Sequence, residues 1–150
     1  SVALSGNYAI VGAFGRDDAG GFSSGKAYIY NVTTGNLVHT LDNPDADGAS
    51  AGDYFGFGVA ISGNYALVSA YNEADAGGIN SGKAYMFDVT TGNLIQTIDN
   101  PNAYGTSGGD RFGYRTALSD SYAIVGAYTA DDVGGTSSGK VYTFKASSSK

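Results

Sequence analysis

The sequence predicts an all-β protein made of repeated units of four short antiparallel strands. Three observations support this fold class. Large apolar and small or polar residues alternate with a period of two in short segments, Gly-rich turns separate the segments, and the whole pattern returns after 57 residues. No segment of useful length shows the 3.6-residue period of an amphipathic helix.

The repeat is the strongest of these signals. The segment VALSGNYAIV, which begins at Val2, returns as VAISGNYALV from Val59 and as TALSDSYAIV from Thr116. About three fifths of positions 2–58 are identical to positions 59–115. Self-similarity at one fixed period is typical of a repeat architecture. We therefore divide the chain, as one array, into units 1–58, 59–115 and an incomplete 116–145, followed by a polar tail at 146–150.

In the middle unit, the first strand is expected over Phe55–Ser62. Its alternation places Phe55, Phe57, Val59 and Ile61 on one face and small residues on the other. The pair Gly63-Asn64 then forms a two-residue turn, because Gly adopts positive φ at little cost and Asn tolerates it. A second strand is expected over Tyr65–Tyr71.

A loop at 72–81 connects this hairpin to the third strand, which we expect over Gly82–Val89. The turn at 90–93, Thr-Thr-Gly-Asn, leads into a fourth strand over Leu94–Asp99. Polar residues are more frequent in this last strand, as expected for an exposed sheet edge. Units of four strands with small residues between them fit propeller-type blades, whereas a sandwich needs no strict period. The third unit stops after its third strand, so eleven strands are expected in all.

Composition excludes several classes of function. The net charge is −6 and only 15% of residues are charged, so a basic nucleic-acid footprint is excluded. There is no Cys and a single His, which leaves no disulfide, thiolate metal site or cysteine nucleophile. No apolar segment reaches the roughly 18 residues of a membrane span.

Phe-Gly pairs and their surroundings resemble the FG-GAP repeat family across nearly the whole chain. The segment GDYFGFGVAISG starts at Gly52, and Phe112-Gly113 supplies the same pair in the next unit. Gly12-Ala13, Ser69-Ala70 and Gly126-Ala127 match the second signature without its proline. The resemblance implies blades like those of integrin alpha subunits and of many secreted or surface-attached bacterial proteins. It also implies an extracellular or cell-surface location and a binding or structural role.

Calcium-binding members of this family carry an Asp-x-Asp-x-Asp-Gly loop between the first and second strands. Here that loop is reduced to residues 5–7, 62–64 and 119–121, which are nearly uncharged. Asp45 and Asp47 look like part of a calcium loop, but the next unit has Asn102 and Tyr104 instead. Calcium prefers six to eight oxygen ligands. We therefore expect no cofactor and no tightly bound metal.

Acidic residues recur in the loop between the second and third strands, where a ring of blades would gather them on one rim. They could form a shared cation site, but solvated turns are the favoured interpretation because each loop offers only one or two carboxylates. These weak metal candidates are Asp17, Asp18, Glu73 with Asp75, Asp131 and Asp132.

Structural roles are expected for the motif residues. Phe55-Gly56 and Phe112-Gly113 should anchor the core, with Tyr85 and Tyr142 buried beside them between blades. Asp53 and Asp110 should accept backbone N–H groups in the entry turn. Lys26, Lys83 and Lys140 could hold an anionic ligand, but pairing with an Asp of a neighbouring blade is favoured.

Two further residues are weak functional candidates. His39 aligns with Gln96 at an exposed position of the fourth strand and has no evident catalytic partner. Asn31 begins the only N-glycosylation sequon, which its counterpart Asp88 has lost. No single acidic residue is seen to break the repeat pattern, so no catalytic residue is assigned.

Two hypotheses follow for function. The first is a non-enzymatic extracellular structural or adhesion module that associates with copies of itself, as an oligomer or filament, because fewer than three blades leave sheet edges and flanks open. The second is a fragment of a larger secreted propeller that binds or hydrolyses polysaccharide, an analogy drawn from other propellers. The expected partners are the chain itself or further blades, with glycans and surface proteins as additional candidates.

Overall fold

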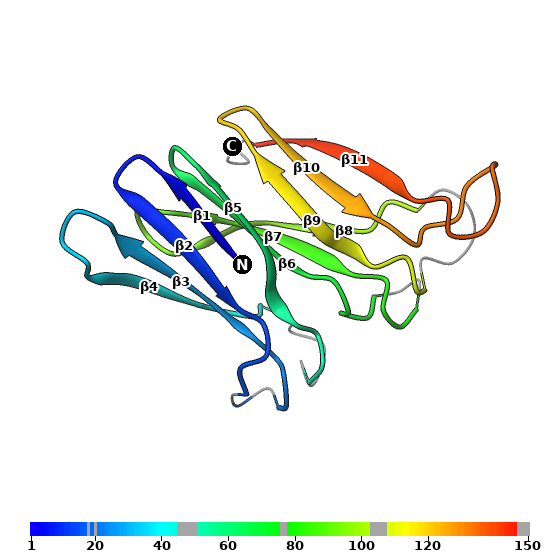
Figure 1. Ribbon diagram of the computed structural model, residues 1–150, viewed down its shortest axis with the longest axis horizontal. Helices are drawn as coiled ribbons and strands as arrows, with labels where there is room; N and C mark the ends of the chain where they lie inside the picture. Colours follow the sequence, from blue (N-terminus) through cyan, green and yellow to red (C-terminus); the bar gives the residue numbers. More distant parts are fainter. Residues whose placement is uncertain (18, 20, 45–50, 76–77, 103–107, 147–150) are drawn as a thin grey trace.

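The computed structural model describes residues 1–17, 19, 21–44, 51–75, 78–102 and 108–146. Within these residues the chain is all-β, as predicted, and forms three antiparallel sheets of four, four and three strands. Figure 1 shows the sheets side by side in chain order, like successive blades of a propeller. No helix that could cross a membrane occurs in the described part of the chain.

Each sheet is a meander in which strands that follow one another in sequence pair with one another. The first sheet consists of β1 (Val2–Ser5), β2 (Tyr8–Ala13), β3 (Lys26–Asn31) and β4 (Leu37–Asp42). The second consists of β5 (Phe55–Ser62), β6 (Tyr65–Ala70), β7 (Lys83–Asp88) and β8 (Leu94–Asp99). The third consists of β9 (Phe112–Leu118), β10 (Tyr122–Ala127) and β11 (Lys140–Lys145).

The three sheets share one strand register. Tyr85 on β7 lies opposite Val68 on β6, and the two residue pairs 57 positions away in either direction do the same. The turn between β5 and β6 has Gly63 at a φ of +53°, which a residue with a Cβ rarely adopts. The 57-residue sequence repeat is therefore also the structural repeat.

Sheet boundaries differ slightly from the repeat units counted along the sequence. The second and third sheets begin at Phe55 and Phe112, before the unit boundaries at 58/59 and 115/116. The third sheet contains three strands among the described residues. Within these residues β11 is therefore an edge strand, whereas the equivalent strands β3 and β7 are flanked by β4 and β8.

One face assignment in β5 is wrong. Phe55 lies opposite Ala70 and Val59 lies opposite Val68, so a bulge separates the two pairs. Phe55, Val59 and Ile61 enter the core, but the bulge turns Phe57 away from it, and this ring is only half-buried. Simple alternation cannot predict the change, because the bulge depends on positive φ angles at Tyr54 and Gly56.

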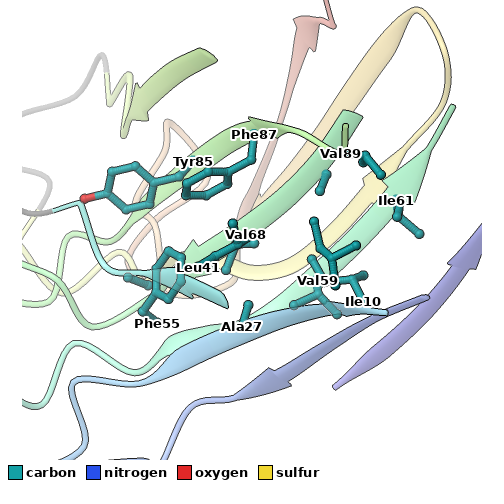
Figure 2. Packing of buried hydrophobic residues seen from close by; sticks show 13 residues of the cluster. Ile10, Ala27, Leu41, Phe55, Val59, Ile61, Val68, Tyr85, Phe87 and Val89 are labelled. Atoms are coloured by element: carbon teal, nitrogen blue, oxygen red, sulfur yellow. The ribbon is translucent and has the colours of Figure 1, made fainter. Parts of the chain in front are cut away.

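The core consists of two clusters, one between each pair of neighbouring sheets. Figure 2 shows the first cluster, in which Phe55 and Val68 of the second sheet face Ile10, Ala27 and Leu41 of the first. The second cluster joins the opposite face of the middle sheet to the third sheet; its members include Leu67, Ala84, Met86, Phe112 and Val125. Among the described residues, the middle sheet is thus covered on both faces, whereas each end sheet is covered on one.

Candidate functional site

The joint between neighbouring sheets is built around the Phe-Gly turn. At the first joint, the backbone N–H groups of Gly52, Tyr54 and Phe55 donate to the carbonyl oxygens of residues 22–24, over 2.8, 3.1 and 3.0 Å. At the second joint, residues 109, 111 and 112 donate to residues 79–81 over 2.9, 3.1 and 2.8 Å. Each turn is therefore held by the same three backbone hydrogen bonds to the sheet before it.

Glycine forms the seat on which each turn rests. A Cβ added to Gly25 would lie 2.1 Å from the carbonyl oxygen of Phe55, and one added to Gly82 would lie 2.0 Å from that of Phe112. Both glycines also have positive φ, at +85° and +84°. A side chain at either position would both strain the backbone and displace the incoming turn.

The Phe rings fix the turns in the core. Phe55 and Phe112 are fully buried, and their ring centroids lie 5.9 and 5.6 Å from those of Tyr85 and Tyr142. Tyr85 is buried, as predicted, whereas Tyr142 is half-buried against the second core cluster. The Phe-Gly pair therefore closes the joint both through its backbone and through its ring.

The third sheet repeats this seat, and no turn of the described chain rests on it. Gly139 has a φ of +79°, as Gly25 and Gly82 do, yet the nearest atom to an added Cβ is Tyr128 O, 3.3 Å away. A cavity of about 460 Å³ opens there, and its lining includes Tyr114, Gly126, Gly139 and Val141. We call this surface the open seat.

Around the open seat, the outward face of the third sheet is apolar. We define the exit face as Ala117, Ile124, Gly126, Gly139, Val141 and Thr143, which align with buried positions of the middle sheet. Val141 is 69% exposed, whereas its equivalent Ala84 is fully buried by the third sheet. Ile124 is likewise exposed where its equivalent Leu67 is buried.

The first sheet has a matching uncovered face on its other side. We define the entry face as Val2, Leu4 and Val32, which align with the buried residues Val59, Ile61 and Val89 of the middle sheet. Leu4 is 68% exposed, whereas Ile61 is 6% exposed. The described residues thus present two largely apolar faces whose counterparts pack against each other at the internal joints.

Aromatic rings form a continuous band beside the joints. The band consists of Phe14, Tyr54, Phe57, Tyr71, Tyr114 and Tyr128, with neighbouring ring centroids 4.2–6.0 Å apart. Two guanidinium groups lie over it. Arg111 lies near the rings of Tyr71 and Tyr128, and Arg115 lies 4.6 Å from the centroid of Tyr114. The band is half-exposed and links all three sheets.

Glu73 is the acidic residue whose departure from the repeat was not predicted from the sequence. It is fully buried; its Oε1 accepts a hydrogen bond of 2.5 Å from the Tyr85 hydroxyl and lies 3.0 Å from Lys83 Nζ. Its Oε2 has no hydrogen-bond partner within the part of the chain that the structure describes. Burial raises the pKa of Glu73 to about 7, although both partners oppose this increase.

The sequence does contain a signal that distinguishes Glu73 from the recurring loop acids. Arg16 and Ala130 occupy the equivalent positions, so Glu73 breaks the repeat and is not one of the recurring acids. Grouping it with Asp75 as a solvated loop acid was wrong. It remains enclosed, and no open cavity leads to its carboxylate among the pockets described.

The recorded lysine ion pairs lie within sheets. Lys26 pairs with Asp42, because the β3–β4 register places these residues opposite each other, and Lys83 pairs with Glu73. Both recorded acidic partners belong to the same unit as their lysine, whereas the predicted partner is an Asp of a neighbouring blade. Lys140 donates a hydrogen bond of 3.2 Å to Asn102 Oδ1.

Asp53 and Asp110 lie beside their Phe-Gly turns and are almost completely buried. Asp53 Oδ2 accepts a hydrogen bond of 3.0 Å from Asn43, and Asp110 Oδ2 accepts bonds of 2.9 and 2.8 Å from Asn100 and Asn102. Burial raises the pKa of Asp110. These side-chain amides tie the turn to the segment that follows the fourth strand.

The loop acids have local roles. Asp17 Oδ1 accepts from Ser23 N over 2.9 Å, and Asp131 Oδ1 accepts from Ser137 N over 2.7 Å, two equivalent contacts that fix the loop before β3 and β11. Asp75 pairs with Gly78 and Asp132 with Gly135 through backbone bridges. Among the described residues, no three His, Cys, Asp or Glu side chains form a metal-binding group. Asp18, Asp45 and Asp47 lie outside the described residues.

The two remaining candidates occupy turn contacts. His39 is half-buried and not fully exposed as predicted; its Nε2 lies 3.0 Å from Thr90 O in the neighbouring sheet. Asn31 Oδ1 accepts from the N–H groups of Thr33 and Thr34, and Asp88 accepts the equivalent bonds. Asn31 and Asp88 therefore play the same part in their turns.

Comparison with known proteins identifies the repeat. The model of the FG-GAP repeat matches residues 1–30, 45–87 and 102–144, more than three quarters of the chain. No curated protein matches the sequence. Among solved structures, the β-propeller domain of Cps50 (Swd1) from Myceliophteria thermophila is similar, with a TM-score of 0.54 at 12% identity. The alignment covers 95% of this chain and 37% of that one, so the chain spans little more than a third of that domain.

Proposed function

Because the chain belongs to the FG-GAP repeat family, we propose that it is a non-enzymatic extracellular structural module that associates with copies of itself. In this assembly the exit face of one copy packs against the entry face of the next. FG-GAP repeats are typical of extracellular and surface proteins, which supports the location and an adhesive or scaffolding role.

The observation that carries the proposal is the equivalence between the end faces and the internal joints. Ile124 and Val141 on the exit face, and Val2 and Leu4 on the entry face, are exposed copies of positions that are buried between sheets. Burying one such aliphatic side chain contributes about 1.5–3 kcal/mol. Water exposure of two complementary apolar faces therefore favours association.

The contact is head-to-tail, because the two faces differ. A head-to-tail contact produces a ring if its rotation closes and a helical filament if it does not. Rings of this type contain four to eight blades. Copies that each supply fewer than three complete blades are compatible with both a ring and a filament. The mass of the assembly in solution distinguishes the two.

The test is light scattering of the full chain at micromolar concentration. We expect a mass above the 15.2 kDa of one chain. Leu4→Lys removes the entry face and Ile124→Lys removes the exit face, so each variant alone should be monomeric. Mixed together they retain one intact copy of each face and should form a dimer. Ile79→Lys, at an exposed loop position outside both faces, is the matched control and should assemble like the unmodified chain.

A folded, monomeric unmodified chain overturns this proposal. So would assembly that persists in both Lys variants, because the contact would then lie elsewhere on the molecule.

The aromatic band supports a second candidate, polysaccharide binding as part of a larger secreted propeller. Sugar rings stack on aromatic faces, and the guanidinium groups of Arg111 and Arg115 supply hydrogen-bond donors beside them. A glycan panel should score binding and hydrolysis separately. Binding that is lost in Tyr128→Ala, with no hydrolysis, would favour this candidate, whereas turnover abolished by replacing one carboxylate would identify an enzyme.

A further inference from the structure

Three side chains meet at the second joint in an arrangement that supports a covalent reaction. Lys140 Nζ donates a hydrogen bond of 3.2 Å to Asn102 Oδ1, and Asn102 Nδ2 donates one of 2.8 Å to Asp110 Oδ2. We propose that Lys140 and Asn102 form an isopeptide bond within the chain, with Asp110 as the catalytic residue and ammonia as the product released. The proposal is independent of self-association, because all three residues belong to one copy.

The fold brings these residues together from separate parts of the chain. Lys140 begins β11 in the third sheet, Asn102 follows β8 of the second sheet, and Asp110 lies in the turn before β9. Lys140 and Asn102 are 38 residues apart in sequence. Because the fold holds the amine against the carboxamide, their reaction is intramolecular, and alignment raises the effective concentration of one group at the other.

Asp110 is positioned to move the protons. It is 3% exposed, and its Oδ2 accepts a second hydrogen bond of 2.9 Å from Asn100, which fixes the carboxylate beside the nitrogen that leaves. Burial raises the pKa of Asp110, whereas the Asn100 amide and the charge of Lys140 lower it. General acid–base catalysis needs such a group within hydrogen-bond reach of the reacting atoms, and Asp110 meets this condition at Asn102 Nδ2.

The reaction balances without a co-reactant. Asp110 takes a proton from the Lys140 ammonium, and the lone pair of the neutral amine forms a bond from Nζ to Cγ of Asn102. The bond from Cγ to Nδ2 breaks as Asp110 returns its proton to Nδ2. A second proton passes from Nζ to the departing ammonia, so the Asn102 nitrogen leaves as ammonium and Asp110 ends as a carboxylate. Diffusion of ammonium into solvent opposes the reverse reaction.

The equivalent lysine of the middle sheet has a different neighbour. Lys83 Nζ lies 3.0 Å from Oε1 of the buried Glu73, so a carboxylate holds its ammonium group. Ala130 replaces Glu73 in the third unit, and this position beside Lys140 therefore supplies no carboxylate. The contact of Lys140 with a carboxamide distinguishes the two lysines, and loss of ammonia is expected at Lys140 alone of the pair.

The bond would give this chain a covalent connection of a kind that it cannot obtain from cysteine, which its sequence lacks. A link between positions 102 and 140 joins the segment after the second sheet to the third sheet. It constrains the unfolded chain as a disulfide between the same positions would, and it therefore favours the folded state.

The experiment is mass spectrometry of the full chain, purified in its folded form and kept at mildly alkaline pH. We expect an intact mass that is lower than the sequence mass by one ammonia. Trypsin does not cleave after an acylated lysine, so digestion should release a branched peptide that joins residues 84–111 to residues 116–145. Fragmentation of this peptide should locate the link at Asn102 and Lys140.

Three variants provide the matched controls. Lys140→Arg keeps the positive charge without the nucleophilic amine and should retain the full mass. Asp110→Asn removes the acid–base group and should slow the loss of ammonia by about a hundredfold or more. Lys83→Arg alters the equivalent lysine of the middle sheet and should lose ammonia as the unmodified chain does. Amide spectra verify that each variant is folded.

The branched peptide separates this reaction from cyclisation of Asn102 with its own backbone, which also releases ammonia. A folded, unmodified chain that keeps its full mass and is cleaved after Lys140 overturns the proposal. So does loss of ammonia that persists in Lys140→Arg. Equal rates in Asp110→Asn and the unmodified chain overturn the catalytic role of Asp110. None of these results depends on whether copies of the chain associate.

Discussion

The Tyr85 hydroxyl donates a 2.5 Å hydrogen bond to Glu73 Oε1, and the equivalent Tyr142 hydroxyl is buried with no hydrogen-bond partner among the described residues. The difference arises because Ala130 stands where the middle unit has Glu73. One joint thus contains a buried carboxylate with one unsatisfied oxygen, and the other contains an unsatisfied hydroxyl. An unsatisfied buried polar group costs about 1–3 kcal/mol, so both are sites where the chain is less stable than its fold allows.

Glu73 should make stability depend on pH. Its pKa rises from the ordinary 4.5 to about 7 in the folded chain, so the folded state binds the proton more tightly than the unfolded state. The stabilisation is therefore complete below about pH 4.5 and is lost as the pH rises to about 7, a change on the order of 3 kcal/mol. Glu73→Gln, which keeps the acceptor for Tyr85, should remove this slope and exceed the unmodified chain in stability at pH 8. Urea unfolding at pH 5 and pH 8 measures both effects, and parallel pH profiles of the two proteins would contradict the prediction.

Phe112→Ala should destabilise the fold by about 3–5 kcal/mol, since it leaves a cavity in the second core cluster. Phe22→Ala removes an equally large ring that is exposed, and should change stability by less than about 0.5 kcal/mol. Denaturant unfolding of both variants gives the comparison. A loss below about 1 kcal/mol for Phe112→Ala would mean that the Phe-Gly pair does not anchor the core.

Gly82→Ala and Gly139→Ala separate backbone strain from the joint contact. Both glycines have positive φ, so Ala should cost about 1 kcal/mol at either position. Only Gly82 has the Phe112 carbonyl oxygen within 2.0 Å of the added Cβ, so its substitution should cost at least about 2 kcal/mol more. Equal losses in unfolding free energy would show that the turn adjusts to the new side chain.

Calcium should not stabilise the chain. Asp17 and Asp131 use an oxygen on backbone N–H groups of their own loops, and the described loops offer too few further oxygens for this ion. Thermal unfolding with millimolar calcium and with a chelator should give the same midpoint. A higher midpoint with calcium, reversed by the chelator, would reveal a site at loop acids such as Asp45 and Asp47.

The repeat offset and the strand pattern predicted most of the fold, because both reflect local chain geometry and a burial pattern that recurs in every unit. Phe57 shows where this reasoning fails. Its orientation depends on a bulge created by positive φ at Tyr54, a non-Gly residue whose strained backbone is imposed by contact with the neighbouring sheet. Propensity gives no warning of such an angle.

The site was harder to predict than the fold. Motif residues such as Phe55 and Asp53 stand out in sequence, but the meaning of Gly139 emerges only when its surroundings are compared with those of Gly25 and Gly82. Lys83 illustrates the same limit, since its partner Glu73 comes from a loop whose course the sequence does not fix. A sequence pattern does not specify the contacts between segments that lie far apart along the chain.

The seat glycines at positions 25, 82 and 139 also bear on how the gene can change. Each unit encodes a seat, and a Phe-Gly turn follows the seats at Gly25 and Gly82 and packs on them. Recombination that inserts or deletes whole units therefore preserves every surviving joint without compensating mutations. The joints therefore tolerate a change in the number of whole units better than a substitution at an occupied seat glycine.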